Sequence, residues 1–146
     1  MTQNEPLGSL QSSAERHWFN DNFSGFRHVN YLPFDQHLLA ALCADPDRYL
    51  FITGSYLYED WTNPPGMFFT YLAAKKVFDY LGVRDHIAVL LHREGHMITD
   101  ADLVYLLDFC DHHFYGKEPQ MDLARLTQSL YLEPANLDPQ FEPYLD

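Results

Sequence analysis

Two continuous apolar runs stand out in the middle of the chain. They cover residues 49–53 (Tyr-Leu-Phe-Ile-Thr) and 86–91 (His-Ile-Ala-Val-Leu-Leu), and turn-forming residues bound each of them. Short apolar runs without alternation are typical of strands that are buried on both faces, as in a parallel sheet. The pattern therefore predicts two buried strands.

Apolar residues at helical spacing predict helices around these strands. The predicted helices cover residues 34–43, Met67–Leu81 and a stretch from a cap at Thr99 or Asp100 to near Gly116. Strands and helices alternate, which favours an α/β fold with parallel strands joined by crossover helices. Because two strands make a poor independent sheet, we interpret the chain as the closing half of a larger α/β domain.

The two ends of the chain differ from this centre. Residues 1–16 are polar and predict a leader that is disordered or loosely attached. Aromatic residues without a regular period follow between 17 and 31, which indicates an ordered loop. Residues 117–146 carry four prolines and predict an extended tail, with a short helix at Met121–Leu130. The folded domain is therefore expected to span residues 17–116.

The composition supports one folded domain and limits the classes of partner that we expect it to bind. The 146 residues are 47% hydrophobic, which is enough for a core, and they carry a net charge of −12. That charge repels nucleic acid and anionic membranes, so neither is expected as a partner. Cys43 and Cys110 lie among apolar residues and are predicted to be buried free thiols.

The start of the sequence leaves localisation open between two expectations. Met1–Glu5 lacks the basic region and the apolar run of a signal peptide, and no apolar stretch is long enough to span a bilayer. If Met1 is the native start, a cytoplasmic location is expected. If the sequence is truncated at its N-terminus, the whole protein is expected to be secreted or periplasmic.

Ionisable residues follow both predicted strands. Glu59 and Asp60 come after the first strand, and His96 comes after the second, directly behind Gly95. The carboxyl ends of parallel strands meet at one sheet edge, where ligands of α/β proteins bind. His96 is a candidate general base, and one of the two carboxylates is a candidate to hold its Nδ1–H. The alternatives are a surface histidine at a turn and carboxylates that are solvated or cap the turn before Pro64.

A metal site is not predicted, and no cofactor is expected. His92 and His96 have i, i+4 spacing, but a strand end and Gly95 intervene, so the helical geometry of a metal pair does not apply. The sequence shows no cysteine pair or third convergent ligand. We interpret His112 and His113 as cations favoured at the C-terminus of the last helix.

The sequence contains no recognisable serine nucleophile. Gly-x-Ser-x-Gly does not occur, and Ser55 follows a strand without the helix that would build a nucleophile elbow. Cys43 and Cys110 lie in predicted apolar helices and are expected to be unreactive. The chain therefore offers an acid and a base without their usual third partner.

Five segments between residues 17 and 116 form a series. They are His17-Trp18-Phe19, the run Leu-Pro-Phe-Asp-Gln-His-Leu-Leu-Ala-Ala-Leu at 32–42, Asp60-Trp61-Thr62-Asn63-Pro64, the predicted helix over 73–82 and Gly95-His96. In order and spacing this series resembles the C-terminal part of the glucuronoyl esterases, carbohydrate esterase family 15. The resemblance implies the C-terminal portion of an α/β-hydrolase fold.

This resemblance also implies a function. The family's members are serine esterases that cleave esters between glucuronic acid on xylan and lignin alcohols. By this resemblance His96 matches the triad histidine, Asp60 or Glu59 the triad acid, and Trp61 a tryptophan that contacts the sugar acid. From the residues alone, packing within the core or a loop is the alternative for Trp61. The family's Gly-x-Ser-Arg segment, with the nucleophile and the oxyanion arginine, is expected upstream of His17.

Two departures from the family pattern leave the substrate open. The stretch over 43–48 is a shifted version of the family's Ile-Ala-Pro-Arg, and Met97-Ile98 follow the histidine where many members place His-Cys. Another carbohydrate ester would fit the same residues.

We predict that the chain alone has no esterase activity. The alternatives are a non-catalytic fragment that associates through an exposed sheet edge, and a small acidic binding protein with Asp60 and His96 far apart.

Overall fold

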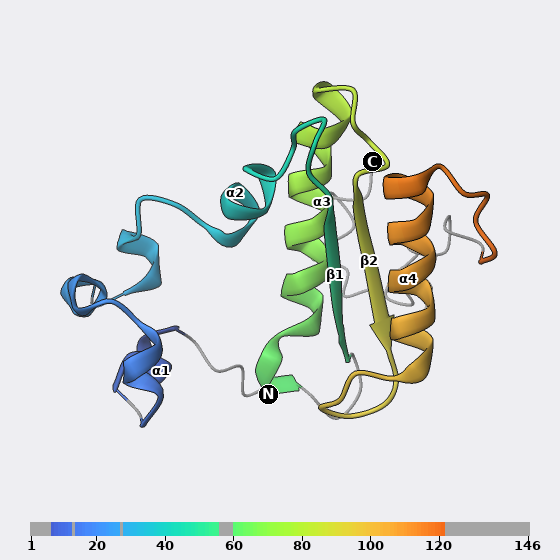
Figure 1. The fold of residues 1–146 in the computed structure, drawn as a ribbon. Coiled ribbons are helices and arrows are strands. Elements are labelled where there is room, and N and C mark those ends of the chain that lie inside the picture. The colour runs from blue at the N-terminus through green and yellow to red at the C-terminus, as the bar shows by residue number, and fades with distance from the viewer. Residues whose placement is uncertain (1–6, 13, 27, 56–59, 122–146) are drawn as a thin grey trace, which may run out of the picture.

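A parallel pair of strands forms the centre of the fold (Figure 1). The structure is a computed structural model that describes residues 7–12, 14–26, 28–55 and 60–121. Strand β1 (Leu50–Ser55) runs parallel to β2 (Ile87–His92), with Leu50 opposite Ile87 and Ser55 opposite His92. Both strands therefore end at the same edge of the sheet. The two strands predicted from the apolar runs are confirmed, each displaced by one or two residues at its ends.

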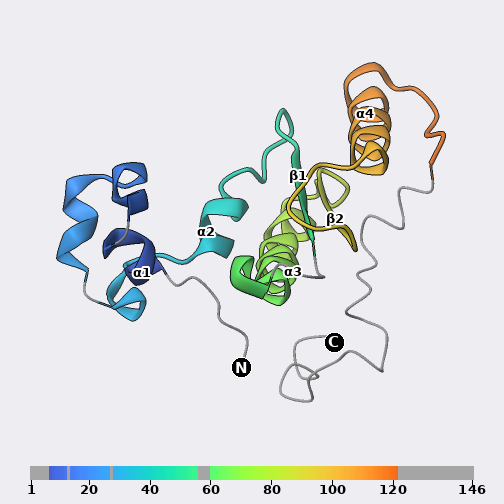
Figure 2. The ribbon, with the colours of Figure 1, turned by 90° about the horizontal axis from the view of Figure 1, so that it is seen from below.

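Helices α3 (Pro64–Tyr80) and α4 (Asp100–Tyr115) lie on opposite sides of this sheet, as Figures 1 and 2 both show. Successive residues of a strand point to opposite faces, so each strand contributes to two layers. The main core joins α3 to one face of β2 through Phe68, Tyr71, Ala74, Phe78, Ile87, Val89 and Leu91. On the other face, Ala88 packs with Phe109 of α4. The predicted crossover order, strand–helix–strand–helix, is confirmed.

Capping residues fix the ends of the two long helices. Asn63 adopts a left-handed conformation (φ 55°), and its side chain accepts a hydrogen bond from the N–H of Gly66 at the start of α3. Thr99 and Asp102 form a reciprocal capping box at the start of α4. Gly116 ends α4 in the left-handed region (φ 64°), which glycine adopts without steric cost. The predicted cap at Thr99 and the stop at Gly116 are confirmed.

Two helix starts differ from those predicted. Helix α3 begins at Pro64 rather than Met67, because the first turn of a helix tolerates proline, whose missing N–H would be unpaired there anyway. Helix α2 (Gln36–Ala41) begins two residues late, because the Asp35 side chain caps it by accepting the N–H of Gln36.

The N-terminal part contains more helix than the sequence predicted. Helix α1 (Leu7–Ser12) and the 3₁₀ helix η1 (Ala14–Trp18) lie largely within residues 1–16, for which a disordered or loosely attached leader was predicted. The aromatic segment contains two further 3₁₀ helices, η2 (Asp21–Gly25) and η3 (Val29–Tyr31).

Contacts between near neighbours support the 3₁₀ helices of the aromatic segment. The rings of Phe19 and Phe23 stack with centroids 4.9 Å apart, and His28 and Tyr31 meet edge to face. Such short-range contacts do not produce the long apolar period on which the sequence prediction relied.

The helix predicted at Met121–Leu130 lies almost wholly outside the described residues, and so do the tail's later residues.

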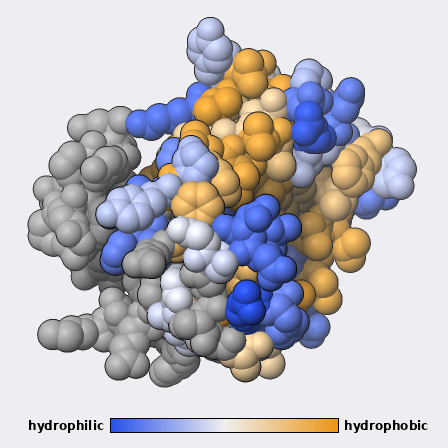
Figure 3. All heavy atoms as spheres, turned by 90° about the vertical axis from the view of Figure 1, so that its left-hand side faces the viewer, coloured by the Kyte–Doolittle hydropathy of each residue, from blue (hydrophilic) through white to orange (hydrophobic). Residues whose placement is uncertain are grey.

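Large apolar side chains remain exposed in and beside α2 and on α4. They are Leu38, Leu39, Leu42, Leu103, Val104, Leu107, Phe114 and Tyr115. Figure 3 faces the side of the molecule that carries α1 and α2, and apolar atoms gather over its upper part. Such uncovered surface is typical of an interface between parts of a larger domain or between chains. Within the described residues, none of the helices combines the length and apolar character needed to cross a membrane.

Candidate active site

The candidate site lies at the sheet edge where both strands end. After β1 the chain reaches the short 3₁₀ helix η4 (Asp60–Thr62), and α3 follows. After β2 it passes through residues 93–99 before α4 begins. Because the strands are parallel and in register, these two connections start beside each other, at Ser55 and His92.

His96 and Trp61, which come from these two separate connections, lie together. The centroid of the imidazole ring is 5.1 Å from that of the indole ring, and the ring planes are inclined by 37°. Trp61 is 40% exposed, and His96 is exposed as well. The exposure of Trp61 argues against the alternative in which it packs inside the core. A molecule that reaches this edge meets a titratable imidazole and a flat aromatic face at one place.

Of the two candidate acids, the structure describes Asp60 but not Glu59. Asp60 is the first residue of η4 and directly precedes Trp61, so its backbone lies beside the residue that contacts His96. This arrangement disfavours the alternative that places Asp60 and His96 far apart. Glu59 lies outside the described residues. The choice between the two carboxylates stays a prediction.

Asp102 anchors the loop that carries His96. It is only 2% exposed, and its carboxylate accepts hydrogen bonds from the backbone N–H of Thr99 at 2.7 Å and from the Thr99 hydroxyl at 2.8 Å. The same carboxylate accepts the Thr53 hydroxyl at 3.2 Å and lies 3.5 Å from Nε2 of His92. His92 and Thr99 bound the loop, so one buried carboxylate holds both of its ends.

Sequence patterns did not predict this anchor. His92 entered the predictions only as a possible metal ligand, and its position at the end of β2 confirms that helical spacing does not apply there. The spacing Thr-x-x-Asp at 99–102 is a capping-box signature and was the signal that could have revealed Asp102. That Thr53 and His92 converge on the same carboxylate follows from strand pairing, which no local pattern encodes.

A comparison with protein families connects this geometry to a known group of enzymes. The family model described as fungal glucuronyl esterase matches residues 2–82, more than half of the chain. The chain belongs to the glucuronoyl esterase family. This membership confirms the resemblance that the five sequence segments indicated.

Two relatives of this chain are much longer than it is. A multidomain esterase of Ruminococcus flavefaciens is 48% identical over 136 residues, which cover 93% of this chain and 18% of that protein. A 4-O-methyl-glucuronoyl methylesterase of Hypocrea jecorina (strain QM6a) is 39% identical over 75 residues, 51% of this chain and 15% of that protein. The chain therefore spans less than a fifth of each of these two relatives.

A solved structure supports the fold class. The carbohydrate esterase family 15 glucuronoyl esterase from Caldicellulosiruptor kristjansonii matches with a TM-score of 0.78 and 40% sequence identity, over 96% of this chain and 34% of that one. The parallel strands and their flanking helices are thus part of an α/β-hydrolase fold, as predicted.

The serine and the two cysteines considered as nucleophiles lie in unfavourable positions in this chain. Ser55 is buried at the end of β1. Cys43 and Cys110 are free thiols, as predicted, but both are half-buried rather than buried. Cys43 follows the short helix α2, beside the exposed Leu42, and Cys110 lies on α4, much of whose apolar surface is uncovered.

Proposed function

We propose that this chain supplies the histidine- and acid-bearing C-terminal part of a glucuronoyl esterase-type serine hydrolase. The single observation that carries the proposal is the contact between Trp61 and His96 at the carboxyl edge of the sheet, in a chain of this family. The proposed substrate is an ester of glucuronic acid or 4-O-methyl-glucuronic acid on xylan with a lignin-type alcohol.

His96 is the proposed general base. Its imidazole takes the proton of the serine hydroxyl as the oxygen attacks the ester carbonyl, and then returns that proton to the leaving alcohol. The exposed position of His96 leaves room for a serine carried by another part of the domain. Asp60, or else Glu59, holds the other ring N–H and stabilises the imidazolium while the proton is on the ring.

Trp61 is the proposed binding residue for the sugar. Its indole face is large and apolar, and it lies beside the imidazole, so a sugar ring stacked on it would place its carboxyl ester near His96. Asp102 acts indirectly, because it holds the loop on which His96 lies. Asp102 is therefore a positioning residue in this scheme.

An activity assay tests the proposal. The chain alone and the chain joined behind the upstream part of the Caldicellulosiruptor kristjansonii enzyme are assayed on a benzyl ester of glucuronic acid. The joined protein is expected to hydrolyse the ester, and His96→Ala is expected to lower kcat by about 10⁴-fold. Trp61→Ala is expected mainly to raise KM. If the chain alone hydrolyses the ester and His96→Ala abolishes that hydrolysis, the proposal that another part of the domain carries the serine is contradicted.

A non-catalytic interaction module is the second candidate, and the exposed apolar side chains on α4 favour it. In that case the chain persists by pairing its uncovered helix faces and sheet edge with another chain. Size-exclusion chromatography with light scattering separates the two candidates when combined with the assay above. An oligomer that stays inactive after joining to the upstream part would favour the module.

A further inference from the structure

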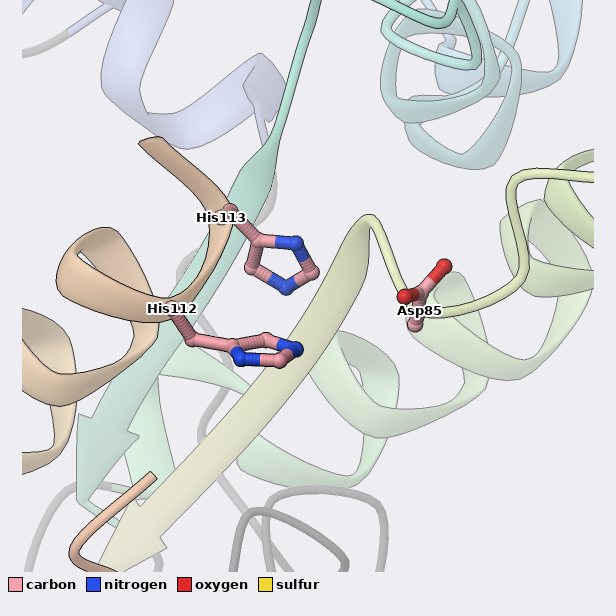
Figure 4. A group of neighbouring side chains, drawn as sticks. All are labelled: Asp85, His112 and His113. Carbon is pink, nitrogen blue, oxygen red and sulfur yellow. The ribbon is translucent and has the colours of Figure 1, made fainter. Parts of the chain in front are cut away.

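Three potential metal ligands meet at the end of the sheet opposite the candidate active site. Asp85 lies in the turn before β2, and His112 and His113 lie in the last turn of α4. One ligand atom from each of the three residues can be chosen so that all lie within 4.8 Å of one another. Figure 4 shows both imidazole rings extending from the end of α4 toward the turn that carries Asp85.

We propose that Asp85, His112 and His113 bind one zinc ion or a similar divalent transition-metal ion. Two histidine nitrogens and one carboxylate oxygen are a common ligand set for zinc, with water in the fourth position. Tetrahedral zinc at ordinary ligand distances holds its ligand atoms about 3.3 Å apart. Asp85 is exposed, so its side chain is able to rotate toward the two histidines.

The hydrogen bonding of His112 suits a metal ligand. Its Nδ1 lies 3.0 Å from the carbonyl oxygen of Lys117, so Nδ1 carries the proton and donates it to that carbonyl. In the neutral ring, Nε2 then keeps a lone pair with which it can bind an ion. Zinc-bound histidines commonly donate their second ring N–H to a backbone carbonyl in this way, which fixes the ring orientation.

Aromatic neighbours fix the position of the His113 ring. The imidazole packs against the rings of Tyr49 and Phe109, with centroids 4.7 and 4.4 Å away. A side chain that packing already orders loses little conformational freedom when it binds an ion.

The position of the cluster indicates a structural role. The C-terminus of a helix favours positive charge, and the whole chain carries a net charge of −12. An ion held by these three residues would join the end of α4 to the turn between α3 and β2. It would lie far from His96, so this inference does not depend on the proposed esterase function. Sequence patterns gave no third ligand because Asp85 is distant from the two histidines along the chain.

Zinc titration of the untagged, chelator-treated protein tests the proposal. Isothermal titration calorimetry is expected to show one zinc ion per chain, and zinc is expected to raise the midpoint of thermal unfolding relative to EDTA. Cobalt(II) is expected to give the visible absorption of a tetrahedral site. Asp85→Asn and His112→Gln, which remove ligands without disturbing the Tyr49 and Phe109 packing, are each expected to weaken zinc binding by about tenfold or more.

His28→Gln is the matched control, because His28 is an exposed histidine far along the chain from this cluster. It is expected to bind zinc as the unmodified chain does. The proposal is overturned if the chain binds no zinc at micromolar concentrations. It is equally overturned if Asp85→Asn and His112→Gln bind zinc as tightly as His28→Gln does, which would indicate adventitious binding by scattered histidines.

Discussion

The indole of Trp61 and the imidazole of His96 face each other across the carboxyl edge of the sheet, with ring centroids 5.1 Å apart. They belong to connections that follow different strands, so the parallel register of β1 and β2 brings them together. In a member of the glucuronoyl esterase family, this pairing places a candidate base and a candidate sugar-binding surface at one point.

The contact makes Trp61 a reporter of His96. In a Trp18→Phe background, His96→Ala is expected to uncover one face of the Trp61 indole and shift its fluorescence emission to longer wavelength. Met97→Ala is the matched control, since Met97 is the next residue in the same loop and is exposed. An equal shift in both variants would mean that the loop, rather than the ring contact, shields the indole.

Asp102 is expected to stabilise the fold through the anchor that it forms. Asp102→Ala removes the half of the capping box in which the carboxylate accepts the Thr99 N–H, and it leaves His92 and Thr53 without their shared carboxylate. The loss of a buried, hydrogen-bonded charge of this kind is expected to lower the free energy of unfolding by about 3 kcal/mol. Urea denaturation measures that loss.

Asp100→Ala provides the control for Asp102. Asp100 lies in the same first helical turn but is exposed, so its removal affects only the interaction with the helix dipole. A loss below about 1 kcal/mol is expected. If the two variants lose equal stability, the buried network contributes nothing beyond the charge at the helix start. If Asp102→Ala also shifts the Trp61 emission, the anchor positions the loop of His96.

The sequence predicted the parts of this molecule that rest on local patterns. The two strands, the long helices and the stop at Gly116 follow from continuous apolar runs, helical spacing and capping residues. His96 was predicted to share one sheet edge with Glu59 and Asp60, because the ends of parallel strands meet there. Trp61 entered only through the family resemblance, and its ring contact with His96 agrees with a shared edge while the roles of these residues stay predictions.

What the sequence missed depends on contacts between distant residues. Asp102 joins Thr53 to His92 only after the strands pair, and Asp85 meets His112 only after α4 packs on the sheet. The helix in the leader was missed for another reason. Its single turn and a half is too short for a period to emerge among polar residues.

Tyr71 is expected to reduce stability through its hydroxyl group. It is among the most buried side chains, and its hydroxyl oxygen has no hydrogen-bond partner among the described residues. Burial raises the pKa of this hydroxyl to about 12, which reflects the same lack of solvation. Tyr71→Phe keeps the ring and removes the unpaired group, so the free energy of unfolding is expected to rise by about 1 kcal/mol.

A matched variant on the same helix serves as the control for Tyr71→Phe. Tyr80→Phe changes the same group on the same helix at an exposed position and is expected to leave stability unchanged within about 0.5 kcal/mol. Thermal or urea unfolding of both variants gives the difference. A Tyr71→Phe variant that is less stable than the unmodified chain would show that the hydroxyl has a partner in solution.

Asp108 is expected to make stability depend on pH. Its carboxylate accepts the backbone N–H groups of Gln120 and Met121, at 3.0 and 2.7 Å, and so holds the segment after α4. These hydrogen bonds are the main cause that lowers the pKa of Asp108 below 3.8, and the charge of His112 adds to them. A carboxyl with a lowered pKa in the folded state stabilises that state at neutral pH.

The sign of the pH effect follows from that lowered pKa. The stabilisation by Asp108 is fully present above about pH 4, the ordinary range for aspartate, and is lost as the pH falls through the lower pKa of the folded state. Asp108→Asn is therefore expected to be less stable than the unmodified chain at pH 6, and the gap is expected to narrow toward pH 2.5. Asp100→Asn controls for the removal of one negative charge. If the gap between Asp108→Asn and the unmodified chain stays constant over this range in urea denaturation, the carboxylate charge does not hold residues 120 and 121.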